Sequence, residues 1–163
     1  MIPVQCAPQV HPVTTEHIVR VESGGNPLAL HDNTTGRSYS PDSVRAAVSA
    51  LKKLLARGHS VDVGLMQVNS RNFARTRLTP DTAFDECANV RAGGQILVDA
   101  WRQSVGHGYA GQTALWHAVQ VYNSGNLHGA PGYAAAVFRV ERPVHRAQYS
   151  TQPAQFSVAW VAK

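Results

Sequence analysis

The segment TEHIVRVESGGNP, residues 15–27, contains the first transition that defines the fold. Apolar residues at helical spacing predict a helix over residues 15–23 with Thr14 as its N-cap. Two glycines and a proline then end the helix, so Glu22 falls in its last turn. The helix dipole disfavours a negative charge there and the neighbouring valines are apolar, so both effects would raise the pKa of this carboxyl. A raised pKa suits a general acid that works near neutral pH, although a solvated glutamate at a helix end is the plainer alternative from these residues alone.

Apolar residues at helical spacing continue along much of the chain. They predict further helices over residues 41–57, 70–75, 85–104, 112–122 and 132–141. In the first of these, Ser40 is the expected N-cap, Pro41 occupies the first helical position, and Val44 begins the apolar stripe.

The longest predicted helix begins with Asp85 as its N-cap. It contains Gly93-Gly94, and each glycine would cost about 1 kcal/mol in a helix unless another segment packs closely against it. Residues 59–69 alternate apolar with polar or small side chains, which indicates a short strand. Residues 31–40 are polar and rich in turn formers, which indicates a loop or a short irregular strand. The pattern therefore predicts a single α+β domain that is mainly helical.

Length, apolar runs and charge exclude some classes of protein. The chain has 163 residues, enough for one domain, and no apolar run long enough to span a membrane. Fifteen basic residues face ten acidic ones, giving a net charge of +5. This balance suits an anionic partner, although solubility alone would also explain it. The basic residues are dispersed and no nucleic-acid motif is present, so a nucleic-acid partner is not expected.

Two cysteines, Cys6 and Cys87, lie far apart and outside any CxxC motif. In a cytosolic protein they would be incidental, whereas in an exported protein they could close a loop of about 80 residues. Residues 1–12 show neither the basic nor the apolar region of a signal peptide. The protein is therefore expected either to stay inside the cell or to be a mature form without its signal.

Two further motifs combine residues that can bind ligands. Residues 64–69, GLMQVN, join two apolar side chains to two amides after a glycine, a mixture that suits sugar hydroxyl and acetamido groups. Residues 122–126, YNSGN, place a tyrosine just inside a helix end. Each has a plainer alternative: a strand end with core Leu and Met for the first, and an ordinary helix stop with a core tyrosine for the second.

Together these motifs resemble the soluble lytic transglycosylase family. The ordered set is ESGGNP at 22–27, GLMQVN at 64–69 and YNSG at 122–125. CAP at 6–8 and CANVRAGG at 87–94 are similar to the specialised subgroup associated with type IV secretion and related transport machines. The resemblance implies a lysozyme-like fold of the goose-type lysozyme and transglycosylase class, with peptidoglycan as the substrate.

The resemblance also implies roles for single residues. Glu22 would be the catalytic acid and base, Ser23 would orient or contact it, and Cys6 and Cys87 would form a disulfide. The substrate-binding residues it implies are Ser23, Met66, Gln67, Asn69, Tyr122 and Asn123. No metal and no cofactor are expected. The implied reaction cleaves the bond between N-acetylmuramic acid and N-acetylglucosamine and closes a 1,6-anhydro ring on the muramic acid.

Three other functions remain open. A lysozyme-type hydrolase would need a second carboxylate to hold water, and Asp62 or Asp32 is the candidate. A non-catalytic peptidoglycan-binding assembly factor would have no need for an acid at Glu22. A metal hydrolase is disfavoured because the eight histidines are scattered and no HExxH motif occurs.

The resemblance finally predicts where the protein works. We expect a periplasmic monomer without a transmembrane segment that acts on glycan strands beside components of a secretion system. Residues 1–142 would form the catalytic domain. Residues 143–163 would form a C-terminal tail, with room for one strand at 155–161.

Overall fold

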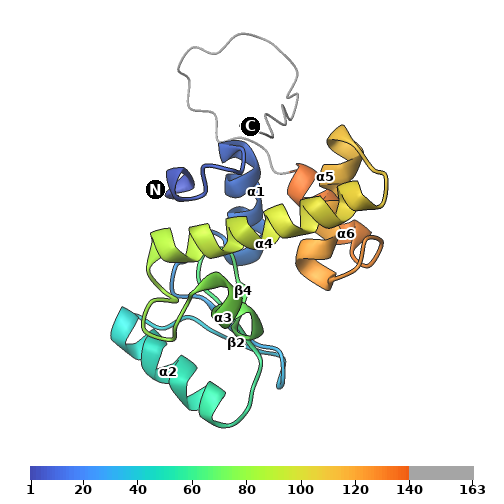
Figure 1. Cartoon of the computed structure of the whole chain (residues 1–163). Helices are drawn as coiled ribbons and strands as arrows, with labels where there is room; N and C mark the ends of the chain where they lie inside the picture. Colours follow the sequence, from blue (N-terminus) through green and yellow to red (C-terminus); the bar gives the residue numbers. More distant parts are fainter. Residues whose placement is uncertain (140–163) are drawn as a thin grey trace.

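The computed structural model describes residues 1–139, which form a helical lobe and a β-lobe on either side of one long helix (Figure 1). The tail over 143–163, its strand and the domain boundary at 142 lie outside the described residues. The helical lobe consists of the short helix η1 (Val4–Cys6), α1 (Pro12–Ser23), α5 (Gly111–Ser124) and α6 (Pro131–Arg139). The long helix is α4 (Glu86–Gly106). The fold is mainly helical α+β, as predicted.

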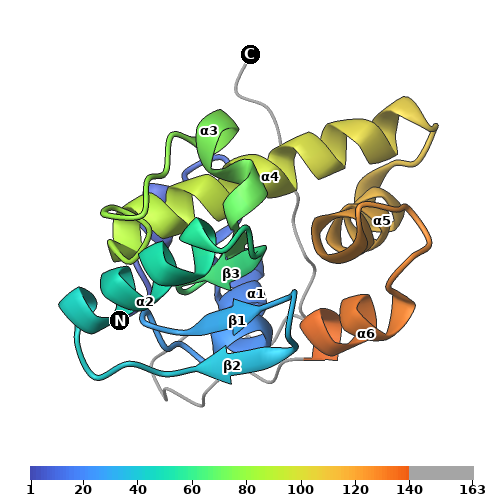
Figure 2. The same ribbon diagram turned by 90° about the horizontal axis from the view of Figure 1, so that it is seen from below.

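The β-lobe is built around a small antiparallel sheet. Its strands are β1 (Leu30–Asp32), β2 (Arg37–Tyr39), β3 (Val61–Val63) and β4 (Val68–Asn69), in the order β2-β1-β3-β4. The lobe is completed by α2 (Val44–Ala56), the short helix η2 (Ser70–Asn72) and α3 (Phe73–Thr76). Figure 2 shows α2 beside the sheet.

Two predicted helix starts are wrong. The N-cap of α1 is His11, whose ring nitrogen accepts from the Val13 N–H, and the helix begins at Pro12. Thr14 is buried within the first turn, where proline at the first position already supplies the favoured backbone angle. The helix α1 therefore begins three residues earlier than the predicted start at residue 15.

The second wrong start is that of α2. Ser43 is its N-cap, and the hydroxyl accepts from the Ala46 N–H at 3.3 Å. Ser40 and Pro41 precede the helix, and Val44 is 53% exposed instead of lying on the buried face. A serine three residues before a free N–H caps better than the Ser-Pro pair further upstream.

The glycine pair in α4 packs as the sequence required. Asp85 caps the helix by accepting from the Ala88 N–H at 2.7 Å. A Cβ at Gly93 would lie 2.5 Å from the Met66 sulfur, and one at Gly94 would lie 2.7 Å from the Cβ of Ala7. The helix can therefore pass between the two lobes only because these two positions carry no side chain.

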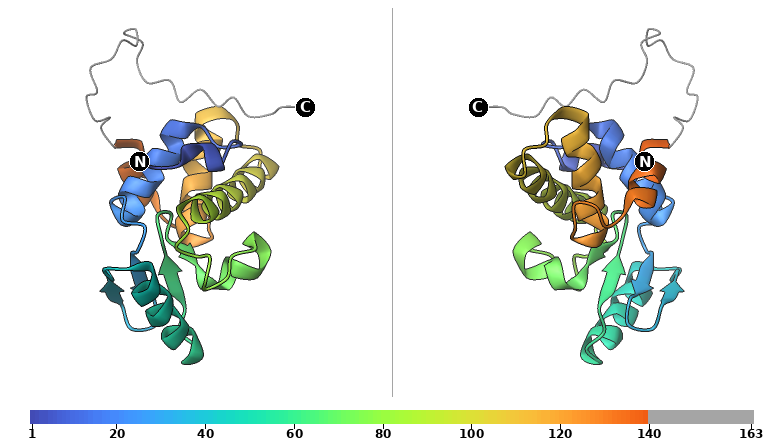
Figure 3. Two further views of the ribbon diagram at one scale, coloured as in Figure 1. Left: turned by 90° about the vertical axis from the view of Figure 1, so that its left-hand side faces the viewer. Right: turned by 90° about the vertical axis from the view of Figure 1, so that its right-hand side faces the viewer.

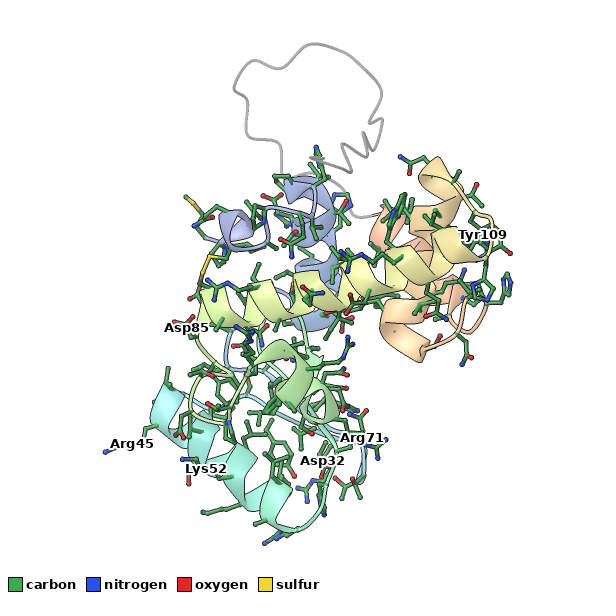
Figure 4. The ribbon with its side chains drawn as sticks, viewed as in Figure 1. Asp32, Arg45, Lys52, Arg71, Asp85 and Tyr109 are labelled. Carbon is green, nitrogen blue, oxygen red and sulfur yellow. A yellow bond between two sulfur atoms is a disulfide. The ribbon has the colours of Figure 1, made fainter. Side chains whose placement is uncertain are left out.

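A disulfide joins Cys6 in η1 to Cys87 in the first turn of α4 (Figure 4). The predicted pairing is confirmed, with a sequence separation of 81 residues. Among residues 1–139, no helix combines the length and apolar character that crossing a bilayer requires.

Candidate active site

The three motifs meet at one turn between the two lobes. This turn, residues 64–67, joins β3 to β4. The Ser23 hydroxyl at the end of α1 donates to the Leu65 carbonyl at 2.8 Å, and the Tyr122 hydroxyl of α5 donates to the Met66 carbonyl at 2.6 Å. Both helix ends that flank the site are thus anchored to the same two peptide units, although the three segments are far apart in the chain.

The turn itself is held from below by Asn89 of α4. The Asn89 side chain accepts from the Met66 N–H at 2.8 Å and donates to the carbonyls of Val63 and Ala83 at 2.9 and 3.0 Å. Its residue is almost completely buried, so these bonds are shielded from water. Gly64 is needed here because its φ is +75° and because a Cβ would lie 2.4 Å from the Asn89 amide nitrogen.

Gln67 adopts a backbone conformation that is rare for a residue with a side chain, with φ at +45°. Its side-chain amide donates to the carbonyls of Gly64 and Ala29 at 2.9 and 3.3 Å, which closes the turn. Strained backbone of this kind concentrates at functional sites, where the surrounding contacts hold it in place.

Glu22 is partly buried in the last turn of α1, before the left-handed Gly24. Tyr133 of α6 donates a short hydrogen bond to its Oε1. Burial raises the Glu22 pKa to about 7, the Tyr133 hydrogen bond opposes this rise, and the negative charge of Asp62 adds to it. Near neutral pH the carboxyl is therefore divided between its protonated and ionised forms.

Two tyrosines and one aspartate surround this carboxyl. Burial and then the charge of Glu22 raise the pKa of both Tyr122 and Tyr133 far above the usual value, so both hydroxyls stay protonated as donors. Asp62 of β3 accepts from the side-chain amides of Asn33 and Asn69 at 2.8 and 2.7 Å. The site thus holds one carboxyl ready to give a proton and one carboxylate solvated by amides.

Glu22 lies where two cavities meet, with volumes of about 560 and 730 Å³. Residues that line both cavities are Glu22, Asn33, Asp62, Gln67 and Asn123. The first cavity continues toward η2, α3 and α4, and the second toward β1 and β2. We call them the η2 arm and the β2 arm of one groove between the lobes. An extended polymer, rather than a small compact ligand, suits a site of this form.

The structure places most of the predicted binding residues on this groove. Gln67 and Asn123 line both arms, Asn69 and Tyr122 line the η2 arm, and Ser23 lines the β2 arm.

Two predicted contacts differ from the expectation. Met66 has no exposed surface and packs under Gly93, so its side chain lies in the core and only its backbone reaches the site. The Ser23 hydroxyl donates to the carbonyls of Val19 and Leu65 instead of contacting Glu22. Ser23 therefore fixes the end of α1 on the turn, which places Glu22 indirectly.

The two candidates for a second carboxylate occupy different environments. Asp62 lines both arms of the groove. Asp32 is buried away from the groove, where burial would raise its pKa. Hydrogen bonds from Thr35, His59 and Thr34 outweigh this effect and lower the pKa to about 2. Of these two, Asp62 is therefore the one that could hold a water molecule beside a bound sugar.

Sequence reasoning missed Tyr133 and underrated Asn89. Tyr133 is one tyrosine near the start of a short helix, and its 111-residue separation from Glu22 leaves no local pattern. Asn89 interrupts the apolar face of α4, and a polar residue at a core position of a helix was the signal that could have revealed it.

Comparisons with known proteins identify a family and several relatives. The family model described as "Transglycosylase SLT domain" matches residues 2–131. The chain is 40% identical over 142 residues to "Protein virB1" of Agrobacterium fabrum, covering 82% of this chain and 55% of that protein. It is 36% identical over 155 residues to "Type IV secretion system protein virB1" of Brucella abortus, covering 91% of this chain and 63% of that protein. The chain thus spans little more than half of these curated relatives' length. No solved structure matches it significantly.

Proposed function

The chain belongs to the transglycosylase SLT domain family, and from this membership we propose that it is a peptidoglycan lytic transglycosylase with Glu22 as its single acid and base. The observation that carries the proposal is a partly buried carboxyl with a pKa of about 7, at the junction of the two arms of a groove. A group with this pKa can give and take a proton near neutral pH, as both steps of the reaction need.

The first step breaks the glycosidic bond. Protonated Glu22 gives its proton to the oxygen between N-acetylmuramic acid and N-acetylglucosamine, and the bonding electron pair leaves with that oxygen. The positive charge that develops at C1 is stabilised by the substrate's own 2-acetamido group. Because Tyr133 holds Oε1, the transferable proton is directed to the other carboxyl oxygen, Oε2.

The second step closes the ring. Ionised Glu22 takes the proton of the muramic C6 hydroxyl, whose oxygen attacks C1 and forms the 1,6-anhydro bridge. The carboxyl is then protonated again and no water is consumed. The high pKa of Tyr122 and Tyr133 keeps both hydroxyls out of this proton transfer and leaves them as donors.

One observation favours a second candidate, a muramidase that hydrolyses the same bond. Asp62 lines both arms of the groove with Glu22 and accepts hydrogen bonds from two side-chain amides. A carboxylate in that position could orient a water molecule toward C1. The two reactions leave different products, because the hydrolase produces reducing ends and the transglycosylase does not.

The name of the Brucella relative supports a place beside a secretion machine. We propose that the protein works in the periplasm and opens the cell wall locally for such an assembly. In its peptidoglycan digests, mass spectrometry should detect 1,6-anhydro-muropeptides.

A Glu22→Gln substitution should remove these products and lower turnover at least 10²–10⁴-fold, the range typical of general acid–base catalysis. The amide keeps the shape of the side chain, so the variant should still bind glycan strands. Asp62→Asn is the matched variant, and it should still form the anhydro products. If Asp62→Asn loses all activity and the wild type forms reducing ends, the protein is the hydrolase. Wild-type turnover by folded Glu22→Gln protein would refute both mechanisms.

A further inference from the structure

The two arms of the groove differ in charge. The η2 arm is lined by two arginines, Arg71 and Arg75, whereas no lysine or arginine lines the β2 arm within residues 1–139. Glycan backbones of N-acetylated sugars are uncharged, so neither arginine is needed to bind the sugar rings. The cations in one arm must therefore serve the groove's own structure or an acidic group on the substrate.

Arg75 serves the structure. Its Nη1 donates to the Asp99 carboxylate at 2.8 Å and its Nε donates to the Asn72 side-chain oxygen at 3.0 Å. This pairing joins α3 to α4 along the wall of the η2 arm. The charge of Arg75 is balanced within the protein.

Arg71 has no such partner. Among the described residues its guanidinium makes neither an ion pair nor a hydrogen bond, although its backbone N–H is fixed by the Asn69 side-chain oxygen at 3.0 Å. Asp62, the acid that shares the groove, is occupied by the amides of Asn33 and Asn69. Figure 4 shows Arg71 at the edge of the β-lobe. The structure thus presents one unpaired guanidinium in one arm of the groove.

We propose that Arg71 binds a carboxylate on the side chain of the muramic acid, so that the η2 arm receives the substituted muramoyl unit. The inference rests on the proposed function. In peptidoglycan the muramic acid carries a lactyl ether that ends in a free carboxylate or continues into a stem peptide with carboxylates of its own. A guanidinium matches either of them with two parallel hydrogen bonds, a geometry that lysine cannot reproduce.

The same contact fixes the direction of the strand. The lactyl group is attached at C3 of the muramic ring, on the sugar whose C1 reacts. Holding that group in the η2 arm would place the muramic ring on one side of Glu22 and the departing N-acetylglucosamine on the other. Arg71 would then determine both which substrates bind well and which way they lie.

Binding by the full chain carrying Glu22→Gln tests the proposal without turnover. Three probes are compared: soluble peptidoglycan strands with stem peptides, the same strands after an amidase has left free lactyl carboxylates, and N,N′,N″,N‴-tetraacetylchitotetraose, which has no carboxylate. Arg71→Gln and Arg71→Lys are added to this background. Arg77→Gln is the control. Arg77 is exposed in the neighbouring segment and lines neither arm, and its substitution removes the same charge.

Arg71→Gln should weaken binding of carboxylate-bearing strands about tenfold and leave chitotetraose binding unchanged, while Arg71→Lys should recover part of the loss. Weakening confined to strands with peptides assigns the contact to a stem carboxylate, and weakening confined to the amidase-treated strands assigns it to the lactyl carboxylate. Weakening on both kinds of strand shows that Arg71 binds either carboxylate. An equal loss in Arg77→Gln, or an equal loss on chitotetraose, would overturn the proposal. The catalytic proposal fails separately, through wild-type turnover by Glu22→Gln. That failure is detected from the products formed, whereas the Arg71 proposal is judged by the ratio of affinities between each Arg71 variant and the background that it shares.

Discussion

The carboxyl of Glu22 is subject to opposing influences within a few ångströms. Burial and the charge of Asp62 favour its protonated form, while the hydrogen bond from Tyr133 favours its ionised form. The balance leaves the pKa at about 7 rather than higher. The hydrogen bond of Tyr133 thus lowers the pKa of Glu22 and holds Oε1, and in the proposed mechanism it positions the proton of the acid.

Tyr133→Phe removes the opposing hydrogen bond and should raise the pKa of Glu22. Because the first step needs protonated Glu22, activity should fall as pH rises through this pKa, and the alkaline limb of the profile should move to higher pH in the variant. Maximal turnover should also drop, since Oε1 is no longer held. The measurement is kcat/KM against pH. Tyr109→Phe is the control, because the Tyr109 hydroxyl contacts His128 and Tyr109 lines neither arm of the groove. An unmoved or acid-shifted limb would contradict the role.

At this scale the sequence pointed to Glu22 and to several residues that line the groove with it, but not to Tyr133. Glu22 was singled out because it lies in the last turn before a glycine pair and because it begins the ESGGNP motif. Tyr133 was not, because the angle at which α6 packs on α1 decides which side chain reaches the carboxyl. A tertiary contact of that kind leaves no mark in the spacing of nearby residues.

Among the elements, α4 carries the most demanding packing. It passes between the lobes, in contact with α5, α3, β4 and η1, and Figure 3 shows it nearly end-on beside the other helices. The Met66 side chain fills the space beside Gly93, and the Met66 carbonyl accepts a hydrogen bond from the Tyr122 hydroxyl. The close packing of α4 against Met66 therefore helps to position the turn to which Tyr122 is bonded.

Gly93→Ala should destabilise the protein by about 1–3 kcal/mol, because its Cβ would be forced against Met66 in a filled core. Gly106→Ala is the control at the end of the same helix, where a Cβ meets nothing within 4 Å. There the change should be neutral or slightly stabilising, since alanine favours the helix. Denaturant unfolding of both variants measures the difference, and equal free energies of unfolding would show that α4 can shift without cost.

Element types were largely predictable, and their boundaries and pairings were not. The turn-rich residues 31–40 form β1 and β2, but β2 is a mostly exposed edge strand, so its polar composition resembled a loop. The starts of α1 and α2 were misplaced because several residues near each start could act as caps. Which one does is decided by where the preceding chain enters the fold.

At the scale of the whole molecule, the groove exists because two lobes are held at a fixed separation across α4. The helical lobe contributes Glu22 and Tyr122, and the β-lobe contributes Asp62 and Gln67. The disulfide ties η1 to the start of α4, where η1 also contacts α1. It therefore constrains the helix that ends in Glu22 relative to the helix that separates the lobes.

Reducing the Cys6–Cys87 disulfide should lower stability more than activity. The bond closes a loop across 81 residues, and in the chain-entropy model such a loop stabilises the folded state by about 4 kcal/mol. For a chain of this length the loss corresponds to a fall in Tm of roughly 10 °C. The double variant Cys6→Ser with Cys87→Ser should show the same low Tm with and without reductant, whereas the wild type should match it only when reduced.

Below the transition both forms should cleave glycan strands, because Glu22, Tyr133 and the turn are held by contacts that do not involve the sulfurs. A reduced wild type with an unchanged Tm would mean that η1 is held by its packing alone, through Ala7 against Gly94.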